Sequence, residues 1–87
     1  MALSFPNASR NYDAAKQSIS FWGYDSAFEV SFHVGREALQ RISGRPCGDE
    51  AELLQAFDSN RSRIHQAATK AYVRRRGTYF SLAPADF

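Results

Sequence analysis

The sequence predicts an α+β domain in which helices cover one face of a small antiparallel sheet. One observation is a stretch of alternating apolar and polar residues in the first half of the chain, which is typical of strands with one buried face. Another is a later stretch with apolar residues at helical spacing, followed by a short final strand. The predicted order is strand, strand, helix, helix, strand, which fits two packed layers. We expect one domain over residues 1–87, because a chain of 87 residues has room for a single modest core.

The first two strands form a predicted β-hairpin over residues 18–34. Apolar and polar side chains alternate in both arms. Between the arms, residues 23–26 (Gly-Tyr-Asp-Ser) have turn chemistry, because Gly and Asp tolerate the backbone conformations of a reversal. A four-residue loop there would pair Phe21 with Phe28. This register puts the apolar residues of both strands on the same face, which an odd-length loop would not do.

The segments on either side of the hairpin are less regular. Residues 1–17 have no clear periodicity and are interpreted as a lead-in. A short helix is predicted over residues 36–43, with Gly44 in the left-handed position that ends it. A third strand is predicted over residues 78–82, with alternate apolar side chains facing inward, followed by a tail.

A long helix is predicted over residues 49–76. Asp49 is a favourable N-cap, and Glu52 follows three residues later at the position of a capping-box partner. The apolar residues fall within an arc of about 100°, so this stripe should face the hairpin. An unbroken helix would be about 42 Å long, which is large for so small a domain. Residues 58–60 are the expected place for a bend.

Composition and cysteine content indicate a globular protein in a reducing compartment. Cys47 is the one cysteine of the chain, so no intrachain disulfide is possible. The N-terminus has no signal-peptide pattern, and no apolar run of about 18 residues is present. We therefore expect a cytoplasmic protein without a membrane span. The formal net charge of +2 is mild and implies no polyanionic partner by itself.

Several core and turn positions resemble a small bacterial family, domain of unknown function 1488. The resemblance covers nearly the whole chain and rests on the following residues: Phe5, Arg10, Tyr12, Asp13, Ile19-Ser-Phe-Trp-Gly, Val34 and Glu37-Ala38-Leu39. It implies a compact α+β domain in a bacterial protein. The family has no established activity, so the resemblance implies no catalytic or binding residues.

The outward-facing residues of the predicted strands form one candidate functional surface. It contains Trp22, Glu29, His33 and Tyr79, together with Tyr24 from the predicted loop. Predicted helices on the other side would leave this face open, unless the N-terminal segment or the C-terminal tail folds across it. Exposed Trp and Tyr side chains are enriched in protein interfaces. The face therefore predicts a protein partner, with self-association as a homodimer the favoured form. Stacking of single-stranded bases is less favoured, because Glu29 would repel phosphate.

A second candidate surface lies on the C-terminal half of the long helix. From residue 61 onward its charged side chains are all basic. Arg63, Lys70 and Arg74 lie opposite the apolar stripe, and Arg75 and Arg76 follow at the end of the helix. Basic side chains near a helix C-terminus interact favourably with the helix dipole. An ordinary solvated helix face therefore explains these residues. The alternative function is a weak, sequence-indifferent nucleic-acid binder that contacts phosphates through these residues. Arg61 projects instead into the apolar arc, where Asp58 is its nearest partner in sequence.

Catalytic and metal-binding patterns are sparse. His33 is expected on the outward strand face, and His65 is expected as a packed residue at the edge of the helix stripe. Neither histidine shares a local motif with an acid or a cysteine, so we expect no metal site and no cofactor. Cys47 lies in a loop beside Arg45 and is interpreted as a thiol without a catalytic role. The sequence thus favours a non-enzymatic interaction module over an enzyme.

Overall fold

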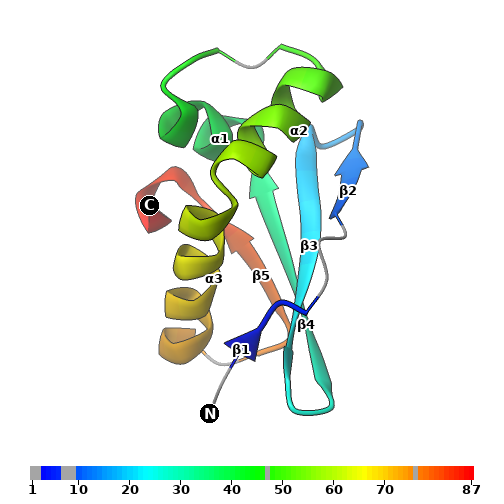
Figure 1. Ribbon diagram of the computed structural model, residues 1–87, viewed down its shortest axis with the longest axis vertical. Coiled ribbons are helices and arrows are strands. Elements are labelled where there is room, and N and C mark those ends of the chain that lie inside the picture. The colour runs from blue at the N-terminus through cyan, green and yellow to red at the C-terminus, as the bar shows by residue number, and fades with distance from the viewer. Residues whose placement is uncertain (1–2, 7–9, 47, 76) are drawn as a thin grey trace.

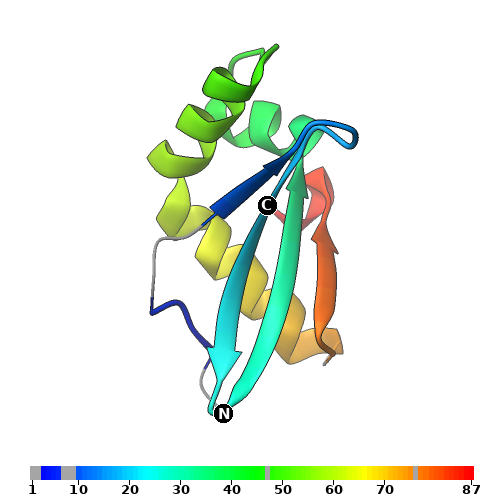
Figure 2. The same ribbon diagram turned by 90° about the vertical axis from the view of Figure 1, so that its right-hand side faces the viewer.

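The computed structural model describes residues 3–6, 10–46, 48–75 and 77–87. Strands and helices pack in two layers, with the helices on one face of the sheet (Figures 1 and 2). This arrangement confirms the predicted α+β class. In chain order the elements are β1 (Leu3–Ser4), β2 (Arg10–Asp13), β3 (Ser18–Asp25), β4 (Phe28–Gly35), α1 (Arg36–Ser43), α2 (Glu50–Ser59), α3 (Arg61–Arg75), β5 (Tyr79–Leu82) and the 3₁₀ helix η1 (Pro84–Asp86).

The hairpin is present, but its predicted loop is wrong. β3 continues to Asp25 and β4 begins at Phe28, so the loop has two residues instead of four. Ser26 adopts a left-handed conformation with φ 57°, which permits this tight reversal. Phe21 therefore pairs with Phe32 rather than with Phe28. The register differs from the prediction by an even number of residues, so the faces are preserved, but Phe28 lies at the tip with 72% of its surface exposed.

The sheet is mixed, not antiparallel as predicted. Its strand order is β1-β3-β4-β5, and β2 also pairs with β3. β5 runs parallel to β4, with Phe80 beside Phe32. The chain leaves the end of β4 and returns through α1, α2 and α3 before β5 begins (Figure 1). A crossover through helices returns the chain to the starting end of its neighbour, and this connection produces a parallel pair.

The N-terminal segment is not a plain lead-in, because it contributes β1 and β2 to the free edge of β3. Leu3 pairs with Asp25, and Arg10 pairs with Phe21. Both strands are too short to display an alternating pattern, and β2 is polar, so periodicity could not reveal them. A short polar edge strand is formed by its neighbour's unpaired backbone groups rather than by its own side chains.

Phe5 links this segment to the core. Its ring lies 5.9 Å from that of Phe21 and stacks on His65 with a centroid distance of 4.0 Å. Gly23 lies beneath it, in the middle of β3 rather than in a turn. A Cβ atom at this position would be 2.9 Å from a Phe5 ring carbon. The glycine is therefore needed for close approach of the N-terminal segment.

The core lies between the inner face of the sheet and the helices. Across three adjacent strands, Phe21 stacks on Phe32 at 5.2 Å and Phe32 stacks on Phe80 at 5.5 Å. We call these three residues the inner aromatic row. From the helices, Leu39, Leu53, Phe57 and Ile64 are buried against the sheet, each with at most 1% of its surface exposed.

The helical residues form three helices. α1 covers the same residues as the predicted short helix, and Gly44 follows it with φ 71°. The predicted long helix is divided at Asn60, within the segment where a bend was expected. The Asn60 side-chain amide donates to the Ala56 carbonyl at 2.9 Å and so closes the end of α2. Asp49 caps α2 by accepting from the Glu52 backbone at 2.8 Å, as predicted.

Candidate functional site

The outer face of the sheet is the first candidate surface. In Figure 2 this face is turned toward the viewer and the helices lie behind it. Neither described part of the termini crosses it: β1 and β2 lie at the edge of β3, and Phe87 packs against the core. We call the outward side chains of β3, β4 and β5 that are not buried the open face, namely Ser20, Trp22, Tyr24, Glu29, Ser31, His33, Tyr79 and Ser81.

The five residues predicted for a partner surface all belong to the open face. Trp22 is half-buried among its neighbours, whereas Tyr79 has 57% of its surface exposed. Tyr24 and Glu29 are directly opposite one another near the hairpin tip. The Tyr24 hydroxyl donates to Glu29 Oε2 at 3.0 Å. This hydrogen bond, followed by the negative charge of Glu29, raises the pKa of Tyr24.

Ser20, His33 and Tyr79 form a second group farther along the open face. The Ser20 hydroxyl lies 3.0 Å from His33 Nδ1, and the rings of His33 and Tyr79 are 4.7 Å apart. We call these three residues the outer row. Burial lowers the pKa of His33 and so does the charge of Lys16, while Asp13 opposes them. The imidazole is therefore held in its neutral form near pH 7.

The contact between Ser20 and His33 was missed from the sequence. The predicted loop would have placed these residues far out of register, and the observed pairing brings them directly opposite one another. The signal that could have located it is the two-residue loop, because it fixes every cross-strand pair of the hairpin.

A hollow of about 270 Å³ lies beside the outer row, at the end of the open face away from the hairpin tip. Ser18 is part of its wall and has only 6% of its surface exposed. Its hydroxyl oxygen is buried and has no hydrogen-bond partner among the residues that the structure describes. The other lining residues are Lys16, His33, Gly35, Tyr79, Ser81 and Leu82.

The predicted basic surface lies on α3, on the opposite side of the core from the open face (Figure 1). Arg63 and Lys70 line a small hollow of about 130 Å³ together with Asp86. Arg75 pairs with the same carboxylate at 3.7 Å and lies over the Phe80 ring. An acidic side chain therefore stands among these cations. Arg74 is exposed near the end of α3, and Arg76 lies outside the described residues.

Arg61 and Asp58 form the predicted pair, with an N–O distance of 2.7 Å. The structure adds Arg10 of β2, which donates to both carboxylate oxygens of Asp58 at 2.9 Å. The Arg10 hydrogen bonds are the main reason that the pKa of Asp58 is lowered, and Arg61 adds to the effect. Arg61 also lies over the Phe57 ring at 4.9 Å. This cluster ties β2 to the junction of α2 and α3, which is a structural role.

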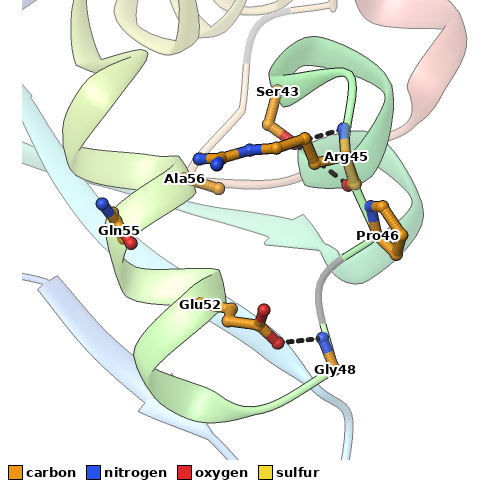
Figure 3. Close-up of a pocket in the computed structure, with 7 residues that line it drawn as sticks. All are labelled: Ser43, Arg45, Pro46, Gly48, Glu52, Gln55 and Ala56. Carbon is orange, nitrogen blue, oxygen red and sulfur yellow. Dashed lines mark hydrogen bonds between the residues drawn. The ribbon is translucent and has the colours of Figure 1, made fainter.

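The loop between α1 and α2 borders a larger cavity of about 440 Å³ (Figure 3). The dashed contacts in the figure belong to the turn itself: Ser43 Oγ donates to the Arg45 carbonyl at 3.2 Å, and the Gly48 backbone donates to Glu52 Oε1 at 2.9 Å. They explain how the loop is held and do not indicate a ligand. Cys47 lies outside the described residues.

His65 is a packed residue at the edge of the core. It stacks on Phe5, and burial is the main cause of its lowered pKa, followed by the charge of Arg61. Within the described ranges, no three side chains among His, Cys, Asp and Glu lie close enough to hold a metal ion. Likewise, none of the described helices has the length and apolar character to span a membrane.

Comparison with known proteins supports the fold and the family. A comparison with curated proteins finds no match. A crystal structure of a protein of unknown function from the DUF1488 family of Shewanella loihica is similar in fold, with a TM-score of 0.80. The two sequences are 14% identical, and the match covers 92% of this chain and 90% of the other. The family model described as "Protein of unknown function (DUF1488)" matches residues 3–80. The chain therefore belongs to the DUF1488 family, as its core and turn residues suggested.

Proposed function

We propose that this protein is a non-enzymatic interaction module that self-associates through the open face. The observation that carries the proposal is the group of aromatic side chains on a sheet face that the described termini leave uncovered. Tyr79 is more than half exposed, and Tyr24 and His33 are held in place by cross-strand contacts. Aromatic residues fixed before binding lose little side-chain entropy on association, which favours an interface.

The charges at the two ends of the open face favour a second copy of this chain as the partner. Lys16 lies at the end with the hollow, and Glu29 lies near the hairpin tip at the other end. In a twofold dimer with antiparallel sheets, Lys16 of each copy comes close to Glu29 of the other. Because the interface is symmetric, this favourable pair occurs twice.

An enzymatic role has less support. Ser20 and His33 are within hydrogen-bond distance, but the hollow beside them is smaller than the 300–1,000 Å³ that is typical of ligand pockets. The contact is accounted for as a cross-strand hydrogen bond of the sheet surface.

Nucleic-acid binding through α3 also has less support. Asp86 lies beside Arg63 and Lys70 and pairs with Arg75, so these cations do not form a uniformly positive surface. Phosphate contacts would have to compete with this carboxylate. The open face also suits nucleic acid poorly, because Glu29 stands among its aromatic residues.

The proposal is tested by measuring molecular mass against protein concentration with sedimentation equilibrium. A monomer has a mass of 9.8 kDa, and we expect the apparent mass to rise with concentration. Glu29→Lys should weaken self-association about tenfold, because two attractive contacts of the dimer become repulsive. The double variant Lys16→Glu/Glu29→Lys should restore it.

The control is Lys70→Glu, a charge reversal on the opposite side of the molecule that should leave self-association unchanged. A mass that stays at the monomer value up to about 1 mM protein would refute the proposal, because weaker association has little biological relevance. Association that the open-face variants do not alter would also refute it. Binding of oligonucleotides that weakens with salt and with Arg63→Glu would instead favour the basic surface of α3.

A further inference from the structure

The hollow at the end of the open face contains a buried polar atom whose hydrogen bonds are not accounted for. Ser18 has 6% of its surface exposed, and its hydroxyl oxygen has no partner among the described residues. Buried hydroxyl groups nearly always form a hydrogen bond, because leaving one unpaired costs free energy. This oxygen has almost no accessible surface, so a group in the hollow becomes its partner once the Ser18 side chain rotates toward the hollow.

The chemistry of the hollow indicates what that group is. Its described lining residues include one cation, Lys16, and no carboxylate. Ser81 contributes a hydroxyl group that can donate a hydrogen bond, and Ser18 adds a second when its side chain rotates toward the hollow. A positive charge combined with hydroxyl donors suits a small oxyanion, since charge-assisted hydrogen bonds are stronger than neutral ones.

His33 can add a further donor. Its Nδ1 atom lies 3.0 Å from the Ser20 hydroxyl. A neutral imidazole that accepts a hydrogen bond at Nδ1 carries its own proton on Nε2, and this N–H is then available to a ligand. His33 is also one of the residues that line the hollow.

The turn before β3 holds Lys16 at the rim. Asp13 Oδ1 accepts from the backbone N–H groups of Ala15 and Lys16, at 3.0 and 3.3 Å. Gln17 closes the turn in a left-handed conformation with φ 49°. The Asp13 carboxylate is thus engaged by the turn and is not among the lining residues. Asp13 lies near enough for its negative charge to oppose the lowering of the His33 pKa. The same charge should weaken anion binding, although the carboxylate does not occupy the hollow.

We propose that the hollow formed by Lys16, Ser18, His33 and Ser81 is a binding site for a small oxyanion, either a carboxylate or a phosphate group. The site has room for such a group and not for a large ligand. The inference does not depend on self-association, although the site lies at one end of the same face.

The test is a titration of the ¹⁵N-labelled protein with sodium phosphate and, in parallel, with sodium acetate, followed by NMR. Sodium chloride at matched ionic strength is the reference. We expect saturable shifts confined to the backbone amides of Ser18, Gly35 and Ser81 and to the His33 ring. Saturation by phosphate but not acetate assigns a phosphate ligand, and the reverse assigns a carboxylate.

Matched variants identify the donors. Ser18→Ala should weaken binding about tenfold, because it removes a buried hydrogen bond to a charged group. Ser31→Ala is the same change elsewhere on the open face and should have no effect. Lys16→Gln should weaken binding about threefold, since Lys16 is exposed. Lys70→Gln on α3 is its control.

The proposal would be overturned if neither anion gave saturable shifts. Saturable shifts of the amides near the cations of α3, instead of those at the hollow, would overturn it as well. Titrations at two protein concentrations separate this proposal from self-association. A dimer that closes over the hollow weakens binding as the concentration rises, whereas a monomer binds equally at both.

Discussion

The inner aromatic row and the outer row occupy the same three strands but have different roles. Phe21, Phe32 and Phe80 are buried under the helices and stack on one another at 5.2 and 5.5 Å. One residue away in β3 and in β4, Ser20 and His33 point outward and meet through a hydrogen bond. The inner row contacts Phe57 of α2 and Tyr72 of α3, whereas the outer row belongs to the face of the sheet that the helices leave open (Figure 2).

Under the proposed function, one sheet separates stability from recognition. On the inner face Phe21, Phe32 and Phe80 are covered by the helices, so their burial contributes free energy to folding. On the open face, polar contacts between neighbouring strands fix the orientation of the aromatic side chains without burying them fully. We therefore expect changes on the inner face to alter the free energy of unfolding and changes on the open face to alter binding.

The largest expected effect comes from Phe32→Ala. Its side chain is fully buried and contacts Phe5, Phe21 and Phe80, so its removal should lower the free energy of unfolding by about 3–5 kcal/mol. His33→Ala, the adjacent residue on the open face, should lower it by about 1 kcal/mol or less. Urea denaturation followed by circular dichroism measures both. Equal losses for the two variants would contradict the proposed separation of roles.

A smaller loss is expected from Gly23→Ala. The new Cβ atom would lie 2.9 Å from Phe5 and 3.1 Å from Leu3, so the N-terminal segment must shift. Overpacking of this kind typically costs about 1–3 kcal/mol. The matched control is Gly35→Ser, since a Cβ atom there meets nothing within 4 Å and serine is a favourable N-cap for α1. If Gly23→Ala were as stable as the control, Phe5 would not be tightly packed at this position.

The smallest effect concerns the pH dependence of stability. Burial lowers the folded-state pKa of His65 below its usual value of 6.5, so the unfolded chain binds protons first. Its contribution to stability is present above pH 6.5 and is lost as the pH falls through the folded-state pKa. His65→Phe keeps a ring against Phe5 and should flatten the decline in stability between about pH 7.5 and 5.

The remaining decline should come from His33, whose pKa is lowered in the same direction. Chemical denaturation at several pH values measures both contributions. An unchanged slope in the His65→Phe variant would show that His65 does not contribute to the pH dependence of stability.

Local sequence patterns were sufficient to predict α1, the N-cap at Asp49 and the alternation of β3, β4 and β5. These features depend on residues close together in the chain, such as a glycine after a helix or apolar residues at every second position. The same alternation placed Trp22, Glu29, His33 and Tyr79 on the side of the sheet where they lie, whereas Tyr24, expected in the loop, belongs to β3. The division between α2 and α3 was expected within three residues of sequence and occurs at Asn60.

Tertiary structure decided the features that depend on distant partners. β1 and β2 exist because β3 has a free edge, and the direction of β5 follows from the path of the chain through the helices. Gly23 belongs to a segment whose composition is typical of a turn, but it lies within β3 and packs against Phe5. The hairpin register brought Ser20 to His33 and left Ser18 buried without a described partner. A sequence determines local backbone preference and the face of each side chain, whereas contacts between segments depend on how all the segments pack together.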